Sequence, residues 1–443
     1  MNSKIKATLR KFLSVVLAAL TVFGCAGAAF AAGSDASGTL NGVNWVYTAA
    51  DKTLVLSGSG TLGEDVADFG LFGGSWVAEH VKIGADVNIT TGRVFENFDF
   101  VDEYEVDANN KYLCNPDGVL MDKDKTVLIK YPAGSKEFSF YTVPDTVKTI
   151  SYRAFEFSSA LKTIFLNDGL ETIENFAFDN CGNLLYITIP GTVTSMGKGV
   201  LAQCNLLNKV TIEEGVTAIP EDAFDRCRSL ETVNLPDSLT TIGDIAFFGC
   251  TKLKTLKLPK KLQTFTDSPG RNFGGLNIAL TVDPENQYFS TDDLGVLYNK
   301  DKTLLYYCPN LPYTFDYTVR CDLNKYAFKG CENLRNVDIA YNLRAIPTYA
   351  FNGCKNLNTV TLPATLQRVD GAAFDSSLNT VNYRGTEELW KLITIDSYDN
   401  SAIKSANVVY NYSEEEEPEE ITFTFDRIQK YCNHNRKRHF DGQ

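Results

Sequence analysis

The side chains best suited to chemistry in this sequence are its eleven cysteines and three histidines. Six cysteines recur in one register, 23 residues apart except across one interruption: Cys181, Cys204, Cys227, Cys250, Cys331 and Cys354. Thiols can bind metals, form disulfides or act as nucleophiles. Equivalent residues of a repeat are related by translation, so their side chains run parallel, which disulfide geometry resists. We therefore interpret these thiols as small buried side chains, while Cys308 and Cys321, outside the register, could still form a disulfide.

The histidines offer little more. Cys432, His434 and His439 could bind zinc, but they are only three ligands, in a segment without periodicity. The one other histidine is His80, which nearly excludes histidine chemistry in the body of the chain. No nucleophile elbow, phosphate-binding loop or His-Glu-x-x-His motif occurs. We therefore predict a non-catalytic protein with no metal and no cofactor.

A 23-residue period positions the cysteines. An aromatic residue usually lies three places before each one, as at Phe178, Phe224, Phe247, Phe328 and Phe351. Alternating Ile-x-Leu stretches follow, which is typical of a short strand with one buried face. Residues such as 219–227 carry Pro and acidic side chains, as the start of a short helical turn would. Because one unit cannot close its own core, we predict an α/β solenoid of 23-residue units with a parallel sheet on one side.

The repeat motif also supports a family resemblance. Residues 246–259 read Ala-Phe-Phe-Gly-Cys-Thr-Lys-Leu-Lys-Thr-Leu-Lys-Leu-Pro. They follow the pattern Ala-Phe-x-x-Cys-x-x-Leu-x-x-Ile-x-Leu-Pro, and roughly residues 36–412 resemble the BspA-like leucine-rich repeat proteins. The resemblance implies a leucine-rich repeat solenoid. It also implies a bacterial surface antigen or adhesin, with a partner that differs from member to member.

Two similar segments interrupt the period, at about residues 104–131 and 280–307. Each contains two apolar stretches around a polar turn, Asp-Lys-Asp-Lys in the first and Asn-Lys-Asp-Lys in the second. This pattern predicts a β-hairpin inserted into a rung of the solenoid. A calcium loop is the alternative, but lysines alternate with the acidic residues, and the glycine and final glutamate of such a loop are missing.

The first residues read as a targeting segment. A basic stretch, an apolar stretch and Ala29-Phe-Ala31 predict a signal peptide cleaved near Ala31, and hence a secreted or cell-surface protein. A membrane anchor and lipoprotein processing at Cys25 are the alternatives. The predicted segments are a signal peptide (1–31), an N-terminal β cap (32–80), the solenoid (81–383), a C-terminal cap (384–412) and a charged, disordered tail (413–443).

Charge and the outward strand positions indicate the kind of partner. The net charge of −13 becomes −17 when residues 1–31, with four basic and no acidic side chains, are removed. This disfavours nucleic acid and anionic membranes as partners, and we expect no membrane insertion after cleavage. The positions between buried strand residues are candidates for binding, although threonine also simply suits an exposed strand. They are Tyr186, Thr188, Lys209, Thr211, Thr232, Asn234, Thr255 and Lys257.

These features predict an exported, adhesin-like protein that binds an extracellular protein or glycan across several rungs. The alternative is a structural component of the cell envelope that associates with itself.

Overall fold

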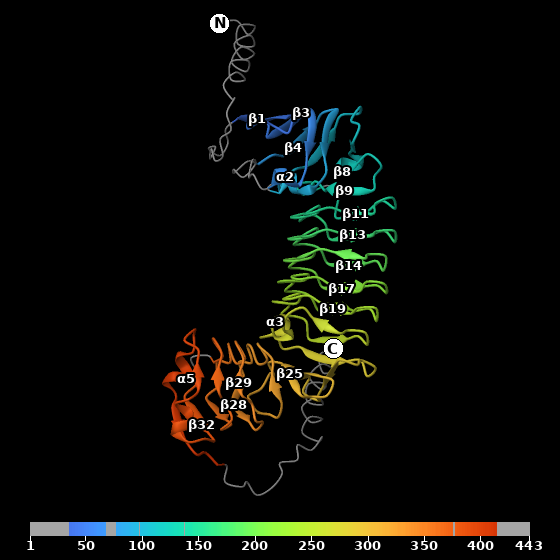
Figure 1. The fold of residues 1–443 in the computed structure, drawn as a ribbon. Helices are drawn as coiled ribbons and strands as arrows, with labels where there is room; N and C mark the ends of the chain where they lie inside the picture. Colours follow the sequence, from blue (N-terminus) through green and yellow to red (C-terminus); the bar gives the residue numbers. More distant parts are fainter. Residues whose placement is uncertain (1–34, 68–76, 97, 137, 375–376, 414–443) are drawn as a thin grey trace, which may run out of the picture.

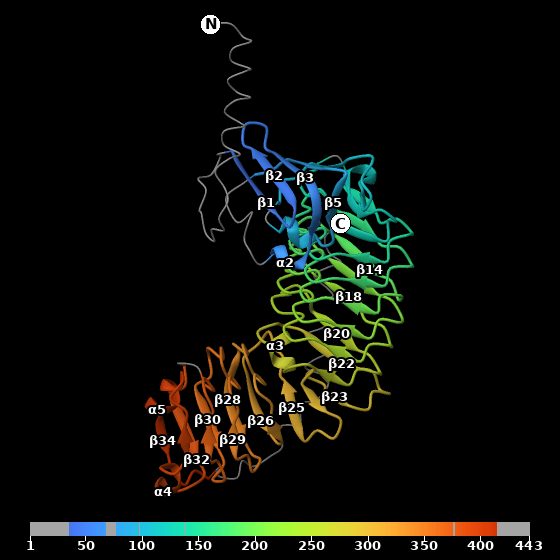
Figure 2. The same ribbon diagram turned by 45° about the horizontal axis from the view of Figure 1, so that its top comes forward.

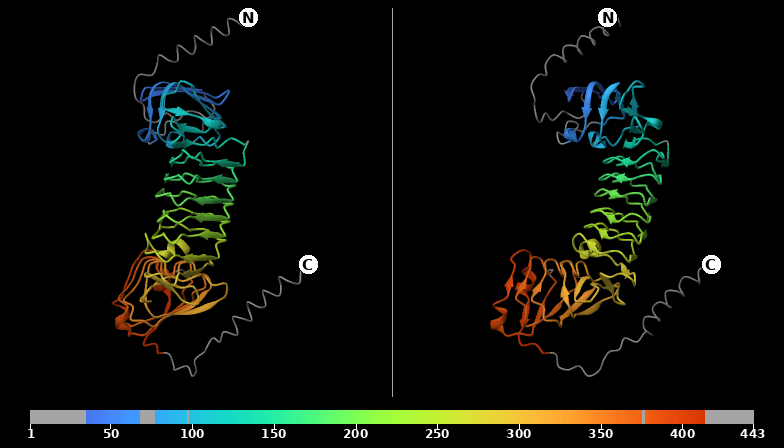
Figure 3. Two further views of the ribbon diagram at one scale, coloured as in Figure 1. Left: turned by 90° about the vertical axis from the view of Figure 1, so that its right-hand side faces the viewer. Right: turned by 45° about the vertical axis from the view of Figure 1, so that its right-hand side comes forward.

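The computed structural model describes residues 35–67, 77–96, 98–136, 138–374 and 377–413. The predicted signal peptide and all but the first residue of the predicted tail lie outside these ranges. The described chain forms a β-solenoid whose rungs stack from an N-terminal to a C-terminal cap (Figure 1). Beyond helix α3 (Pro269–Phe273) the stack changes direction, as Figure 3 shows. The expected parallel solenoid with a period of about 23 residues is confirmed.

The longer strands of the rungs run parallel along one side of the solenoid, and we call this row the main sheet (Figure 2); its pairing is broken between β6 and β10, between β18 and β20, and between β22 and β26. Equivalent residues pair, so that Tyr186 lies opposite Lys209 and Lys209 lies opposite Thr232. Its strands are β4 (His80–Ile83), β6 (Glu103–Val106), β10 (Phe140–Thr142), β12 (Thr163–Phe165), β14 (Tyr186–Ile189), β16 (Lys209–Ile212), β18 (Thr232–Asn234), β20 (Thr255–Leu258), β22 (Ala279–Val282), β26 (Phe315–Val319), β28 (Leu334–Ile339), β30 (Thr359–Leu362), β32 (Thr380–Tyr383) and β34 (Asn407–Val409).

A second row of short parallel strands lies on another side of the solenoid, which the sequence analysis did not foresee. Most of these strands contain the apolar residue 18 places after the first buried residue of the repeat, for example Ile173 after Phe155. They are β11 (Thr149–Ile150), β13 (Thr172–Ile173), β15 (Ser195–Met196), β17 (Ala218–Ile219), β19 (Thr241–Ile242), β21 (Thr264–Phe265), β27 (Asp322–Leu323), β29 (Ala345–Ile346), β31 (Arg368–Val369) and β33 (Thr394–Ile395).

In the regular rungs the Ala-Phe segments, where short helical turns were expected, form turns whose hydrogen bonds run to the next rung. The Phe224 N–H donates to the carbonyl of Ala246 in the next rung, at 2.8 Å, instead of to a residue four places earlier. Asp222 and Arg226 have φ values of 57° and 55°, which are incompatible with a right-handed helix. Helices occur in other places: α2 (Glu64–Ala67), α3, α4 (Glu387–Trp390), α5 (Ser401–Ser405) and the 3₁₀ helices η1 (Gly92–Phe95) and η2 (Pro116–Gly118).

Repeated side chains stack on their equivalents in the core. All the phenylalanines and cysteines of the repeat named above are fully buried. The rings of Phe224 and Phe247 are stacked with centroids 5.3 Å apart, and those of Phe328 and Phe351 are 5.0 Å apart. The Cys227 thiol donates to the Leu201 carbonyl at 3.1 Å, an arrangement that recurs at Cys181, Cys204, Cys250 and Cys354. The cysteine therefore fills space and also satisfies a buried carbonyl.

The two inserts are larger than hairpins. Each is a three-stranded antiparallel sheet whose last strand joins the second row of parallel strands. Neighbouring residues belong to different cores, since Leu120 packs with the N-terminal cluster and Met121 with the central one. Both faces are therefore buried, and the insert separates two cores instead of alternating between core and solvent. The strands are β7 (Leu113–Cys114), β8 (Leu120–Asp122) and β9 (Val127–Lys130), and β23 (Phe289–Thr291), β24 (Leu297–Asn299) and β25 (Leu304–Tyr307).

Both ends of the stack are covered. At the N-terminus β1 (Ala36–Leu40), β2 (Val43–Thr48) and β3 (Thr53–Leu62) form an antiparallel sheet, and β3 then pairs in parallel with β4 and with β5 (Asp86–Ile89). At the C-terminus Thr386 caps α4 by accepting from the Leu389 N–H. Helices α4 and α5 and strand β34 complete the last rungs.

We expect Phe224→Ala to lower the free energy of unfolding by about 3–5 kcal/mol, because it opens a cavity in a stacked column. Thr232→Ala, at an exposed position of the same rung, should change it by less than about 0.5 kcal/mol. Chemical denaturation of the two variants measures the difference. Equal midpoints would show that the buried and exposed positions are wrongly assigned.

Burial also raises the pKa of the thiols of Cys181, Cys204, Cys227 and Cys250. A thiol reagent should therefore modify these four cysteines only after denaturation, since the thiolate is the reactive form. Mass mapping before and after unfolding provides the measurement. Rapid labelling of any of the four in the native protein would contradict their burial.

Candidate functional site

The structure brings six of the eight candidate binding residues together on the outer face of the main sheet. Tyr186, Lys209 and Thr232 form one row across β14, β16 and β18. Thr188, Thr211 and Asn234 form a second row across the same strands. These side chains point outward because successive residues of a strand face opposite sides, and the residues between them point into the core.

The remaining two candidates, Thr255 and Lys257, are set apart from these rows. They lie on β20, which pairs with β22 and not with β18. The Lys257 ammonium also forms an ion pair with Asp283 at 2.8 Å. Because Lys257 is ion-paired and β20 does not pair with β18, the continuous part of the candidate site consists of the two rows on β14, β16 and β18.

An exposed aromatic patch extends this face toward the N-terminus and was missed by the sequence analysis. It consists of Phe140, Phe165 and Tyr186, which are 56%, 50% and 50% exposed. Thr163 of β12 lies between Phe140 of β10 and Tyr186 of β14, and it is only 7% exposed. The three rings line a shallow depression of about 390 Å³ together with Leu185. The alternation of buried and outward positions that identified Tyr186 also predicts that Phe165 points outward. Phe140 could not be assigned in this way because it follows an insert, where the 23-residue period is lost.

A larger groove adjoins this patch where the first insert interrupts the main sheet. Strands β6 and β10 are consecutive in the stack but do not pair. The groove between them has a volume of about 890 Å³. Its lining includes the aromatic side chains of Phe138 and Phe140 and the acidic side chains of Asp102, Glu103 and Asp117. Lys136 and His80 also line the groove, which is therefore partly apolar with an excess of acidic side chains.

A buried charged cluster shows the strongly perturbed titration that often marks catalytic sites. Burial raises the pKa of Glu156 to about 7, although Lys130 and Arg153 oppose the shift. Burial lowers the pKa of Lys130 to about 8. Glu156 forms an ion pair with Arg153, and the Lys130 ammonium donates to the Arg153 carbonyl at 2.8 Å. Because Lys130 and Glu156 are each only 2% exposed, the cluster is typical of structural pairing between rungs rather than of a site open to substrate.

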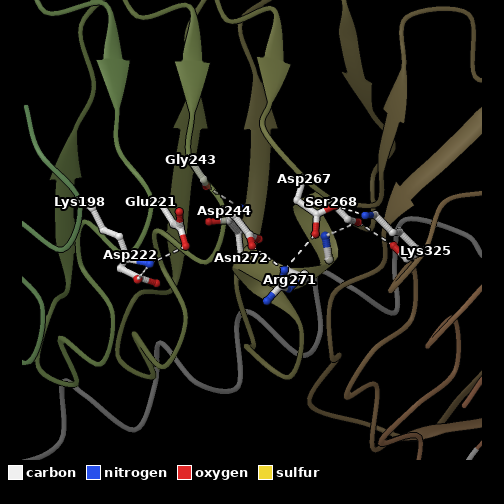
Figure 4. Close-up of polar contacts among 11 residues, drawn as sticks. Lys198, Glu221, Asp222, Gly243, Asp244, Asp267, Ser268, Arg271, Asn272 and Lys325 are labelled. Atoms are coloured by element: carbon white, nitrogen blue, oxygen red, sulfur yellow. Dashed lines mark hydrogen bonds and ion pairs between the residues drawn. The ribbon is translucent and has the colours of Figure 1, made fainter.

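A second polar network braces the bend at α3 (Figure 4). Arg271 forms ion pairs with Asp244 at 2.5 Å and with Asp267 at 3.1 Å, and Lys325 of the following rungs also pairs with Asp267. The Asn272 amide donates to Gly243 at 3.1 Å and its oxygen accepts from the Phe247 N–H at 3.3 Å. These contacts connect the rungs before the bend with those after it.

Two features are missing from the part of the chain that the structure describes. Among residues 35–67, 77–96, 98–136, 138–374 and 377–413, no three His, Cys, Asp or Glu side chains are grouped to hold a metal ion. In the same ranges no helix has the length and apolar character needed to cross a membrane. Cysteines 308 and 321, which could have formed a disulfide, are both free. The possible zinc ligands Cys432, His434 and His439 lie outside the described residues.

Asp179 offers a test of these buried charges. Burial raises its pKa to about 6, and its Oδ1 has no hydrogen-bond partner among the described residues. The unfolded chain loses this proton near pH 4, so the group's contribution to stability falls as the pH rises from about 4 to 6. Asp179→Asn should therefore raise the free energy of unfolding by about 1–3 kcal/mol at pH 7.5 and change it little at pH 4. Urea denaturation at both pH values tests this, and equal effects at the two would contradict it.

Solved structures that are similar to this chain include bacterial leucine-rich repeat proteins of low sequence identity. A leucine-rich cell surface protein from Faecalibacterium prausnitzii is 20% identical, with a TM-score of 0.48 over 86% of this chain and 96% of that one. The pneumococcal vaccine antigen PcpA is 19% identical, with a TM-score of 0.44 over 87% and 89% of the two chains. Among curated protein sequences, none matches significantly.

The sequence itself matches a family model. The BspA type leucine rich repeat region matches in six copies, over residues 133–254, 217–269 and 304–416. These ranges cover more than half of the chain and include the rungs that form most of the main sheet. Proteins of this family are typically associated with the cell surface, and their fold is typically non-catalytic. The chain therefore belongs to the BspA-type leucine-rich repeat family.

Proposed function

We propose that this protein is exported and acts as a non-catalytic, adhesin-like binding protein at or near the bacterial cell surface. Its partner is an extracellular protein or glycan that docks on the outer face of the main sheet. The observation that carries this proposal is the aromatic patch of Phe140, Phe165 and Tyr186 beside the polar rows of β14, β16 and β18. The family's typical surface association supports it.

The chemistry of this face suits recognition. Three large rings about half exposed offer apolar area that a partner can cover, and aromatic residues are enriched in the energetically important parts of interfaces. Rings of this kind also stack on the apolar face of a sugar. The neighbouring threonines and Lys209 supply hydrogen bonds that fix orientation. Because these side chains project from paired strands, they are held in place before binding, which reduces the entropy lost on association.

Binding to a panel of matrix proteins and neutral glycans should reveal a partner and locate its site. The triple variant with Tyr186, Lys209 and Lys257 changed to Ala should bind at least tenfold more weakly, and adding Phe165→Ala should weaken binding further. Its thermal midpoint should stay close to the original, because these side chains are exposed. Biolayer interferometry and thermal unfolding provide the two measurements.

A matched control changes Tyr313, Tyr341 and Lys404, which are also exposed but lie outside the main-sheet face described above. This control variant should retain binding, as should a chain that ends at Ser413. Retained binding by the sheet-face variant, or its loss in the shortened chain, would show that the partner docks elsewhere.

A further inference from the structure

Strand β10 is an open edge of the main sheet. The Thr163 N–H donates to the Ser139 carbonyl at 3.3 Å, and the Val143 N–H donates to the Phe165 carbonyl at 2.9 Å. In a parallel pair alternate residues bond the same neighbour, so Ser139, Tyr141 and Val143 face β12. The N–H and C=O groups of Phe140 and Thr142 therefore point to the other side. Within the described residues these groups have no hydrogen-bond partner.

On the other side of the break, the first insert packs beside β6. The Asn115 side-chain amide donates to the Tyr104 carbonyl of β6 at 2.6 Å. The Gly134 N–H donates to the Val101 carbonyl, just before β6, at 2.9 Å. No described strand pairs with β10 on this side, and the groove of about 890 Å³ lies beside its free edge.

An exposed edge of this kind is a template for a further strand. Tyr141 anchors β10 by packing its ring against Tyr131 and Phe155, so the edge is fixed in position. Thr142 and Phe140 are both exposed. The adjoining groove offers the rings of Phe138 and Phe140 to the side chains of an added strand, and Asp102, Glu103 and Asp117 make it acidic.

The chain itself contains a segment with complementary chemistry. Residues 421–425 read Ile-Thr-Phe-Thr-Phe, in which apolar residues alternate with threonine, a pattern typical of a strand. Residues 421–438 carry five basic side chains and one acidic one. A strand-forming segment that continues into a basic stretch matches an open edge beside an acidic groove.

This segment cannot reach β10 of its own molecule. Residues 414–420 span at most about 25 Å when fully extended. The chain leaves the described body after β34, and ten main-sheet strands separate β34 from β10, which is roughly 50 Å along the stack. The two caps lie at opposite ends of the solenoid (Figure 1). An occupant with this sequence must come from another copy.

We propose that residues 421–425 of a second copy add as a strand to the free edge of β10. Their main chain bonds the N–H and C=O groups of Phe140 and Thr142, one side of the strand packs on Phe138 and Phe140, and the basic residues that follow lie near the acidic groove. The contact is head-to-tail, so repetition links molecules into an open chain. It leaves Tyr186 and Lys209 uncovered and does not rest on the proposed adhesin-like function, although both contacts use Phe140 of the aromatic patch.

A peptide of residues 421–438 with Cys432 replaced by Ser tests the contact directly. It should bind the chain that ends at Ser413, which retains every described rung, as measured by fluorescence anisotropy. A control peptide with Phe423 and Thr424 exchanged has the same composition and charge but lacks the alternation. It should bind at least tenfold more weakly, and equal binding of the two peptides would overturn the proposal.

A backbone substitution in β10 tests the edge. Thr142→Pro removes an N–H that no described residue uses, so the protein should remain folded, whereas strand addition loses a donor and meets the proline ring. We expect peptide binding at least tenfold weaker for Thr142→Pro and within twofold for the matched control Thr142→Val. Peptide binding by folded Thr142→Pro at the original affinity would exclude β10 as the acceptor.

Sedimentation velocity of the chain from residue 32 to 443 completes the test and needs no peptide. The full length should associate with increasing concentration, and both the chain ending at Ser413 and full-length Thr142→Pro should remain monomeric. If the shortened chain associates to the same extent, self-association does not use the tail and the proposal fails.

Discussion

Translational stacking is the constraint on which the rest of this structure depends, because each rung completes the core and the hydrogen bonds of its neighbour. The Phe224 N–H is satisfied by a carbonyl of the next rung, and the Cys227 thiol satisfies a carbonyl of the preceding one. Where the next rung departs from the repeat, a buried asparagine replaces the missing carbonyl. Asn272 accepts from the Phe247 N–H in this way, and Asn400 accepts from that of Ala373.

The inserts show what this constraint permits. A segment can interrupt the period if it presents an apolar surface to the rungs on both sides, as Leu120 and Met121 do in the first insert. The second row of parallel strands ends on β9 of the first insert, whereas no strand of the main sheet pairs with the insert. The first insert therefore keeps the core packed while it opens a groove and an unpaired edge on the main-sheet side. The regular rungs stabilise the solenoid, whereas the first insert creates a groove and an open edge that differ from the surface of a regular rung.

The stacking constraint does not apply to side chains on the outer face of the main sheet. Its side chains complete no neighbour's core, so they can vary without destabilising the stack, and aromatic residues can remain about half exposed there. The buried charges have no such freedom. Glu156 and Asp179 lie in turns one rung apart, and burial raises both pKa values because little solvent reaches them. Perturbed titration in this protein thus follows from stacking polar turns, whereas the surface available to partners lies on the sheet.

The sequence by itself determined the period, the stacked phenylalanines and cysteines, the main-sheet strands and the outward parity of residues such as Tyr186, because a translational repeat shows each buried position many times. Tertiary structure alone decided the rest. The Ala-Phe segments became turns because their N–H groups bond the next rung, which no local helical signal reveals. The aromatic patch needed Phe140, which follows an insert where no period exists, to lie beside Phe165. The open edge of β10 arises because the first insert interrupts the main sheet, so that β6 and β10 follow each other in the stack without pairing, a relation between strands that are distant in sequence.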